Sequence, residues 1–172
     1  MKMGHLRVII GCMFAQKTTE LLKCARNYKD IGSNVIIINH SSDTRYGDKH
    51  ITTHDNDSES SLFIEYLRDV NIQDYQVIII DEGQFFKDLV EYVTLWADTL
   101  DVKIIVAGLS GNTKREPIGD ILKLIPHADE ITHLKSKCSI CNGEAIYSKF
   151  LGEGKPTVGG SESYIPVCRK HL

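Results

Sequence analysis

The sequence has no block of basic residues, no long apolar run and no even set of cysteines. Its 20 lysines and arginines stand against 23 acidic residues, for a formal net charge of -3, so we expect no nucleic-acid partner and no membrane partner. No apolar run approaches the roughly 20 residues of a membrane-spanning helix. The first residues lack the apolar segment of a signal peptide, and five cysteines do not complete a disulfide framework. We therefore expect a cytoplasmic protein.

What the sequence does contain is a set of apolar, β-branched runs separated by segments with helical spacing. The composition, with 42% hydrophobic and 25% charged residues among 172, is that of an ordinary globular protein. The runs lie at 6–11, 33–40, 75–80 and 102–109, and helices are expected at 17–32, 61–70, 87–100 and in 118–134, with room there for a further strand. Such alternation predicts an α/β fold: a parallel sheet with helices on both faces. The polar stretch 41–61 is expected to form a long functional loop.

The pattern changes after about Leu134, where short segments rich in glycine and cysteine follow. We therefore predict two units, a nucleotide-binding α/β unit at 1–134 and a small metal-binding unit at 135–172. Neither unit contains internal repeats.

The segment "GCMFAQKTTELL" has the layout of a phosphate-binding loop between a strand and a helix. Gly11, Lys17 and Thr18 occupy three positions of the G-x-x-x-x-G-K-[ST] pattern, which uses backbone N–H groups, a lysine and a hydroxyl to hold phosphates and magnesium. Gln16 replaces the second glycine; it would be strained at positive φ and tolerated at negative φ. The alternative interpretation is an ordinary strand–helix turn with a solvated lysine.

The segment "VIIIDEGQFF" places two carboxylates at the end of a buried strand. Asp81 and Glu82 match the acidic position that helps to hold magnesium in phosphate-loop enzymes, and Glu82 is also suited to act as a general base. The alternative is a pair of solvated turn residues.

Three cysteines and a histidine near the C-terminus have the spacing of a zinc site. Cys138 and Cys141 form one close pair, and Cys168 and His171 form a second; on opposite hairpin turns these pairs supply the four tetrahedral ligands that structural zinc prefers. A redox C-x-x-C is the alternative, although such motifs usually belong to thioredoxin-like units. Cys12 and Cys24 are expected to be packing residues.

Together these segments resemble the type II, zinc-containing thymidine kinases, most of all those of poxviruses. The resemblance runs nearly end to end and is carried by "GCMFAQKTTELL", "DTRYG" with the following "THD", "IIIDEGQFF", "AGLSG", "ILKLIPHADEI", "CSICNGEAIYSK" and "VGGSESYIPVCRKH". It implies transfer of the γ-phosphate of ATP to the 5′-hydroxyl of thymidine, with ATP, Mg2+ and structural Zn2+ as cofactors. It also implies a homo-oligomer, a tetramer in most of the family.

The resemblance also assigns residues to roles. Glu82 would be the base; the nucleotide would be held by Gly11, Lys17, Thr18, Asp43 and Arg45; and the thymine would be surrounded by Met13, Phe85, Leu109, Ser148 and Tyr164. The stretch 159–164 would belong to a lasso loop that closes on the base.

The sequence departs from the family pattern around the nucleotide and the base. Gln16, Ser110 and Thr113 stand where the family has glycine, aspartate and phenylalanine, and His171 replaces a fourth cysteine. Loss of aromatic packing would weaken thymidine binding or broaden it to other nucleosides. Two further hypotheses are a non-catalytic relative with a binding or regulatory role, and a phosphate-loop protein that acts on another small substrate.

Overall fold

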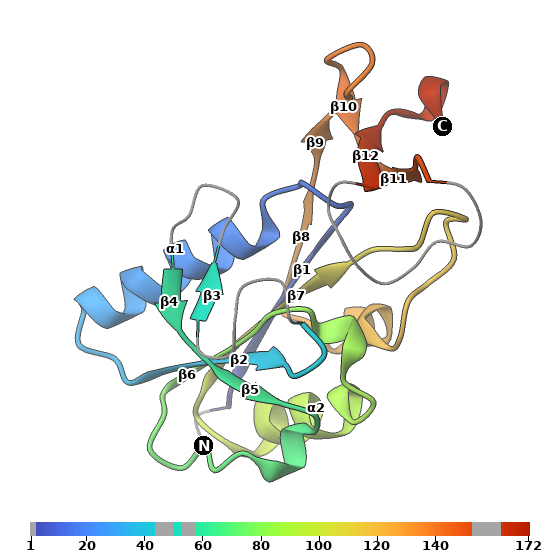
Figure 1. Ribbon diagram of the computed structural model, residues 1–172. Helices are drawn as coiled ribbons and strands as arrows, with labels where there is room; N and C mark the ends of the chain where they lie inside the picture. The colour runs from blue at the N-terminus through green and yellow to red at the C-terminus, as the bar shows by residue number, and fades with distance from the viewer. Residues whose placement is uncertain (1–2, 44–49, 53–57, 153–162) are drawn as a thin grey trace.

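The computed structural model describes residues 3–43, 50–52, 58–152 and 163–172, and within these ranges a six-stranded sheet organises the chain (Figure 1). All neighbouring strands in it are parallel, in the order β5-β2-β6-β7-β1-β8. The strands are β1 (His5–Gly11), β2 (Val35–His40), β5 (Leu62–Ile64), β6 (Val77–Ile80), β7 (Lys103–Leu109) and β8 (Glu130–Leu134). The predicted α/β class with a parallel sheet is thereby confirmed.

The two faces of the sheet are covered by different helices, as predicted. On one face, α1 (Lys17–Asp30) packs Leu21, Leu22 and Ala25 against inward side chains such as Ile79. Burying a side chain of this size contributes roughly 1.5–3 kcal/mol. Helix α1 stops just before Gly32, whose φ of 83° is one that glycine adopts readily.

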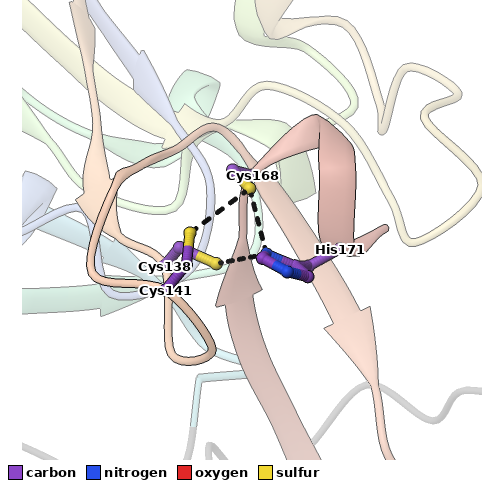
Figure 2. Close-up of side chains that lie close together, drawn as sticks. All are labelled: Cys138, Cys141, Cys168 and His171. Atoms are coloured by element: carbon purple, nitrogen blue, oxygen red, sulfur yellow. Dashed lines mark hydrogen bonds between the residues drawn. The ribbon is translucent and has the colours of Figure 1, made fainter.

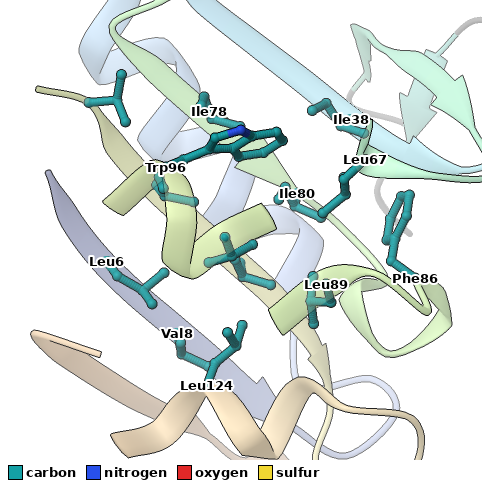
Figure 3. Close-up of a cluster of buried hydrophobic side chains, with 14 of the residues drawn as sticks. Leu6, Val8, Ile38, Leu67, Ile78, Ile80, Phe86, Leu89, Trp96 and Leu124 are labelled. Carbon is teal, nitrogen blue, oxygen red and sulfur yellow. The ribbon is translucent and has the colours of Figure 1, made fainter. Parts of the chain in front are cut away.

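On the other face, α2 (Leu89–Thr99) and the 3₁₀ helix η3 (Ile121–His127) cover the sheet. Figure 3 shows Trp96 and Leu89 of α2 and Leu124 of η3 lying over strand residues such as Ile78 and Ile80. Because both faces are buried, the central strand β6 is apolar at every position rather than alternating.

The helix predicted at 61–70 is wrong. The segment forms the edge strand β5 and a single 3₁₀ turn, η1 (Leu67–Asp69). Pairing with β2 takes up the backbone of residues 62–64, and the Asp88 carboxylate accepts the N–H groups of Leu67 and Arg68. These partners replace the hydrogen bonds that a continuous helix would have made.

The expected long loop at 41–61 contains a short antiparallel hairpin, β3 (His50–Thr52) with β4 (Ser58–Ser60). In 118–134 the predicted helix is η3, of the 3₁₀ type, with Pro126 inside it. Proline lacks the N–H that a continuing α-helix would use. The further strand in this segment is β8.

The last part of the chain forms two small sheets at the carboxyl end of the main one (Figure 1). One pairs β9 (Ser136–Lys137) with β10 (Glu144–Ala145), and the other pairs β11 (Tyr147–Phe150) with β12 (Tyr164–Val167). Their buried core consists of Cys138, Ala145 and Val167. The boundary between two units at 134/135 stays a prediction. Within the described ranges, no helix has both the length and the apolar character to cross a membrane.

Candidate active site and metal centre

The phosphate-binding loop joins β1 to α1, and its backbone is tightly constrained. A Cβ atom on Gly11 would lie 2.7 Å from the carbonyl oxygen of Leu134, so only glycine fits at that position. Gln16, directly before α1, has φ 60° and ψ 32°, and its carbonyl accepts the N–H of Glu20 in the first turn of the helix. The φ angle is therefore positive, the case in which a side chain is strained, by about 1–2 kcal/mol. Gln16 makes the turn that a glycine would make.

The two polar side chains that open α1 have hydrogen-bond partners in the loop and at the end of β6. The ammonium group of Lys17 donates to the carbonyl of Cys12 at 2.9 Å, so it lies back across its own loop. The hydroxyl of Thr18 donates to Oδ2 of Asp81 at 2.8 Å. The loop and the carboxyl end of β6, 63 residues apart in sequence, thus form one site.

The acidic pair after β6 is buried, which excludes the interpretation as solvated turn residues. Asp81 is 3% and Glu82 is 8% exposed. Burial, and then the neighbouring charge of Glu82, raise the pKa of Asp81 to about 7, against the lowering effect of its bond from Thr18. The N–H of Glu82 donates to Oδ1 of Asp81 at 2.9 Å, and Glu82 itself has a left-handed φ of 51°.

One further buried polar side chain, Gln84, contacts the acidic pair, and the sequence analysis missed it. Its amide nitrogen donates to Oε2 of Glu82 at 2.6 Å, and its amide oxygen accepts the N–H of Leu109 at 3.0 Å. The available signal was a glutamine inside an otherwise apolar or acidic segment, "DEGQFF".

At the end of β2, Asp43 lies at the same edge of the sheet. It is 9% exposed; its carboxylate accepts the side-chain N–H of Asn39 at 3.0 Å, and its own N–H donates to the carbonyl of His40 at 2.9 Å. Asn39 is a second buried polar residue that the sequence analysis did not single out. Arg45, and residues 159–162 of the predicted lasso, lie outside the described residues.

Two residues predicted to contact the base are brought together directly. The N–H of Met13 in the phosphate loop donates to the hydroxyl of Ser148 in β11 at 3.0 Å. Leu109 ends β7 beside Gln84. Phe85, in the 3₁₀ turn η2 (Gly83–Phe85), lies with its ring centroid 5.9 Å from that of His40.

Tyr164 pairs with Phe150 across β11 and β12, with 5.1 Å between the ring centroids. A cavity of about 160 Å³ lies next to Ser148, where the ends of β1, β7 and β8 meet β11. It is lined by Cys12, Ser110, Gly111, Asn112, Arg115, His133, Ile146, Tyr147 and Ser148. Ser110, one of the departures from the family pattern, is therefore part of its wall.

The predicted metal ligands converge (Figure 2). The ligand atoms of Cys138, Cys141, Cys168 and His171 lie within 4.8 Å of one another. The Sγ atoms of Cys141 and Cys168 are 3.8 Å apart, and Nδ1 of His171 lies 3.6 Å from Sγ of Cys138 and 3.3 Å from Sγ of Cys168. Standard zinc bond lengths in a tetrahedron give S···S edges of about 3.8 Å and S···N edges of about 3.6 Å. The four groups therefore fit a zinc ion.

The local backbone suits Cys138 as a thiolate ligand. Desolvation acts to raise the pKa of the Cys138 thiol, but hydrogen bonds from the backbone of Cys168, Ile140 and Cys141 outweigh it and lower the pKa to about 5. Cys138 and Cys141 lie in the β9–β10 turn, as predicted. The other pair does not lie on a hairpin turn, because Cys168 directly precedes the 3₁₀ helix η5 (Arg169–His171). Cys12 and Cys24 are buried outside the cluster.

Comparison with known proteins agrees with this geometry. A family model described as thymidine kinase matches residues 4–172. The thymidine kinase of Yaba monkey tumor virus (strain VR587) is 39% identical over 170 residues, covering 96% of this chain and 93% of the relative. That of Vaccinia virus (strain Western Reserve) is 41% identical over 171 residues, covering 97% and 96%, and that of Sheeppox virus (strain KS-1) is 37% identical over 174 residues, covering 99% and 97%. The chain belongs to the thymidine kinase family, and its cluster of three cysteines and one histidine fits the zinc-containing, type II class.

Proposed function

We propose that this protein is an ATP-dependent thymidine kinase that transfers the γ-phosphate of ATP to the 5′-hydroxyl of thymidine. The observation that carries the proposal is the hydrogen-bonded connection between the phosphate loop and the acidic pair, through Thr18 and Asp81. The chain that contains this connection matches proteins named thymidine kinase over nearly their whole length. Phosphoryl transfer needs mainly positioning and neutralisation of charge, and this edge of the sheet provides groups for both.

The phosphates are bound by the loop. Its backbone N–H groups, the start of α1 and the ammonium group of Lys17 favour an anion there. A magnesium ion bound with the nucleotide would neutralise charge on the phosphate oxygens. The hydroxyl of Thr18 and the carboxylate of Asp81 are the hard oxygen ligands that magnesium prefers. Their fit is supported by their proximity, because the hydroxyl oxygen of Thr18 lies 2.8 Å from Oδ2 of Asp81.

The nucleoside hydroxyl is activated by Glu82. This residue closely follows the fully buried strand β6, and its carboxylate takes the proton that the 5′-hydroxyl loses as it attacks phosphorus. Asp43 and Arg45 act near the transferring group. The thymine is enclosed by Met13, Phe85, Leu109, Ser148 and Tyr164, an arrangement supported by the hydrogen bond from Met13 to Ser148.

Gln16 is compatible with this activity. It is the feature that motivates the rival hypothesis of an impaired relative, yet it adopts the left-handed conformation of a glycine, and α1 begins directly after it. Glutamine in place of glycine therefore makes the folded loop less stable but leaves the path of its backbone unchanged.

Zinc has a structural role in this proposal, because all four of its ligands are protein groups and no coordination position is left for substrate. We further propose, from the family resemblance, a homotetramer in the cytoplasm with ATP and nucleoside as its small-molecule partners.

The test is turnover of the zinc-loaded protein with Mg-ATP and thymidine, followed as thymidine monophosphate by chromatography. We expect turnover in the natural protein and a fall of about 10²–10⁴-fold in kcat for Glu82→Gln, the usual contribution of a general base. Glu91→Gln, at an exposed glutamate of α2, is the matched control and should keep full activity.

Three results would contradict parts of the proposal. Unchanged turnover in Glu82→Gln would reject that residue as the base. Turnover of another nucleoside with none of thymidine would reject the substrate. Turnover that appears only in Gln16→Gly would show that the natural chain is an impaired kinase.

A further inference from the structure

Gln84 is a buried amide at the junction of three segments, and it is not explained by packing alone. It is 3% exposed, and burying an amide is unfavourable unless both of its ends are hydrogen-bonded. Both ends are satisfied here, one by the carboxylate of Glu82 and the other by the backbone of Leu109. The side chain therefore bridges the end of β6 to the end of β7.

The orientation of this amide is fixed by chemistry. The backbone N–H of Leu109 can only donate, so it must face the amide oxygen of Gln84, 3.0 Å away. The amide nitrogen then necessarily faces Glu82 and donates to Oε2 at 2.6 Å. A flipped amide would place a donor against a donor at Leu109 and an acceptor against a carboxylate at Glu82.

Two glycines pack closely against Gln84. A Cβ atom on Gly108 would collide with the side-chain amide oxygen of Gln84, and one on Gly119 would collide with its backbone carbonyl oxygen. Gly108 therefore packs against the amide itself, and Gly119 packs against the backbone of η2. Close packing of this kind restricts the rotamers of a buried side chain.

Glu82 is held from two sides as a result. Its N–H is bonded to Asp81 and its backbone is in the left-handed region, while its Oε2 atom is bonded to Gln84. A strained backbone conformation persists when its surroundings over-determine it. The amide of Gln84 thus fixes the position of Oε2 in the carboxylate of Glu82.

We infer that Gln84 is a positioning residue for phosphoryl transfer: it orients the carboxylate of Glu82 that receives the proton of the substrate hydroxyl. The inference rests on the proposed function, in which Glu82 is the base. Through Leu109, the same amide couples the base to the end of β7, which is followed by Ser110 in the wall of the cavity next to Ser148.

The first test is Gln84→Met, which keeps the side-chain length and removes both hydrogen bonds. We expect kcat to fall by about 10–100-fold, since a small misplacement of a reacting group has effects of this order, with KM for ATP within about twofold of the natural value. In the Glu82→Gln background the same substitution should cause no further loss of kcat, because a residue that acts through Glu82 has nothing left to orient.

The matched control is Gln76→Met. The amide oxygen of Gln76 accepts the N–H of Asn34 at 2.8 Å, in the connection that precedes β6, at the opposite end of that strand from Glu82. It is a glutamine with a bond to the backbone and no contact to the acidic pair. Its loss should lower the midpoint of thermal unfolding and leave kcat unchanged. If Gln84→Met does not fold, the isosteric Gln84→Glu variant replaces it, with the same expected loss of kcat.

The outcomes separate this inference from the function on which it rests. Full kcat in a folded Gln84 variant, or losses that multiply in the double variant, would overturn the positioning role and leave Glu82 as the base. Full turnover in Glu82→Gln would instead remove the base itself, and the proposed mechanism would fail first.

Discussion

The metal cluster and the carboxyl edge of the parallel sheet are built in opposite ways. The cluster takes its four ligands from two short segments around an apolar core of three residues, Cys138, Ala145 and Val167. The sheet edge takes its polar groups from the ends of several strands, above two extensive cores on the two faces of the sheet. A region with a small core depends on an ion for its fold, because little else offsets the loss of chain entropy.

A region with a large core can instead hold unfavourable features. The sheet edge contains a buried carboxylate, Asp81, and three non-glycine residues with left-handed backbones, Phe14, Gln16 and Glu82. Each of these costs free energy and is tolerated because the surrounding sheet is rigid. Among the described residues beside the metal ligands the corresponding residue is Asn142, a residue type that adopts this conformation more readily. We therefore expect the region around the cluster to unfold when one metal ligand is replaced. We expect the free energy of unfolding to rise when an unfavourable feature of the sheet edge is removed.

The largest effect is expected from breaking the cluster. Structural zinc contributes about 10–16 kcal/mol in small metal-dependent domains, so Cys141→Ser should abolish stoichiometric zinc binding and unfold the region around β9–β12. The parallel sheet should stay folded. Zinc content by atomic absorption, limited proteolysis and far-UV circular dichroism measure the three parts of this expectation.

Cys24→Ser is the control for the cluster, since Cys24 is a buried residue of α1, outside the metal site. It should retain one zinc per chain. A Cys141→Ser protein with full zinc content and protease resistance would show that the remaining groups hold this region without the fourth ligand.

The next effect is expected at Asp81. Its pKa is raised from 3.8 to about 7 on folding, mainly by burial and then by Glu82, so between these two values the folded state keeps a proton that the unfolded state releases. The free energy of unfolding of the nucleotide-free protein should therefore fall as the pH rises from about 4 to 7, by at most about 4 kcal/mol.

Urea unfolding at pH 5 and pH 7.5 measures this change. Asp81→Asn removes the titrating group, keeps the shape of the side chain and should remove that part of the pH dependence. If the natural protein and Asp81→Asn show the same pH dependence, the buried carboxylate of Asp81 does not destabilise the folded state.

A smaller effect is expected at Gln16. Gln16→Gly relieves a left-handed conformation that costs about 1–2 kcal/mol, less the roughly 0.5–1 kcal/mol of extra chain entropy that glycine loses on folding. The net result should be a gain in the free energy of unfolding of up to about 1.5 kcal/mol, measured by urea unfolding. Lys23→Gly, at an exposed position inside α1, should lose up to about 1 kcal/mol. Destabilisation in both variants would contradict the strain at Gln16.

The same contrast explains which features the sequence alone could predict. The four residues that converge in the cluster were all identified from the sequence, because C-x-x-C and C-x-x-H place the members of each pair close together by local spacing. The buried strands and α1 followed from apolar runs and helical periodicity. The helix expected at 61–70 failed because its backbone is taken up by β2 and by Asp88, a tertiary competition that local spacing does not encode.

At the sheet edge the sequence predicted which residues lie in the site better than it predicted their backbone conformations and hydrogen bonds. Lys17, Thr18 and Glu82 were singled out by motif, but the positive φ of Gln16 depends on how the loop closes against α1. Gln84 was missed because its importance comes from a hydrogen bond to Leu109, 25 residues away. The contribution of a buried amide is visible only when the strands are placed side by side.

The smallest change in the free energy of unfolding is expected where the β3–β4 hairpin contacts α1. This hairpin is bound to α1 by ion pairs, and its described residues contain no metal cluster. Glu59 of β4 accepts hydrogen bonds from Lys29 at 2.7 Å and Arg26 at 3.1 Å. These bonds lower the pKa of Glu59 from its ordinary 4.5, that from Lys29 having the largest effect. Because these side chains are partly exposed, solvent screening limits their contribution to less than about 1 kcal/mol.

Glu59→Gln should therefore lower the free energy of unfolding by less than about 1 kcal/mol at pH 7. A lowered pKa stabilises above the ordinary value, so the difference should disappear as the pH falls below about 4, and also in 1 M salt. Glu144→Gln is the control, since its carboxylate is 75% exposed beside Lys135 and should change nothing measurable. If Glu59→Gln lowers the free energy of unfolding by several kcal/mol, ion pairs alone can stabilise the β3–β4 hairpin. The small core of the β9–β10 hairpin would then not explain why that hairpin depends on a metal.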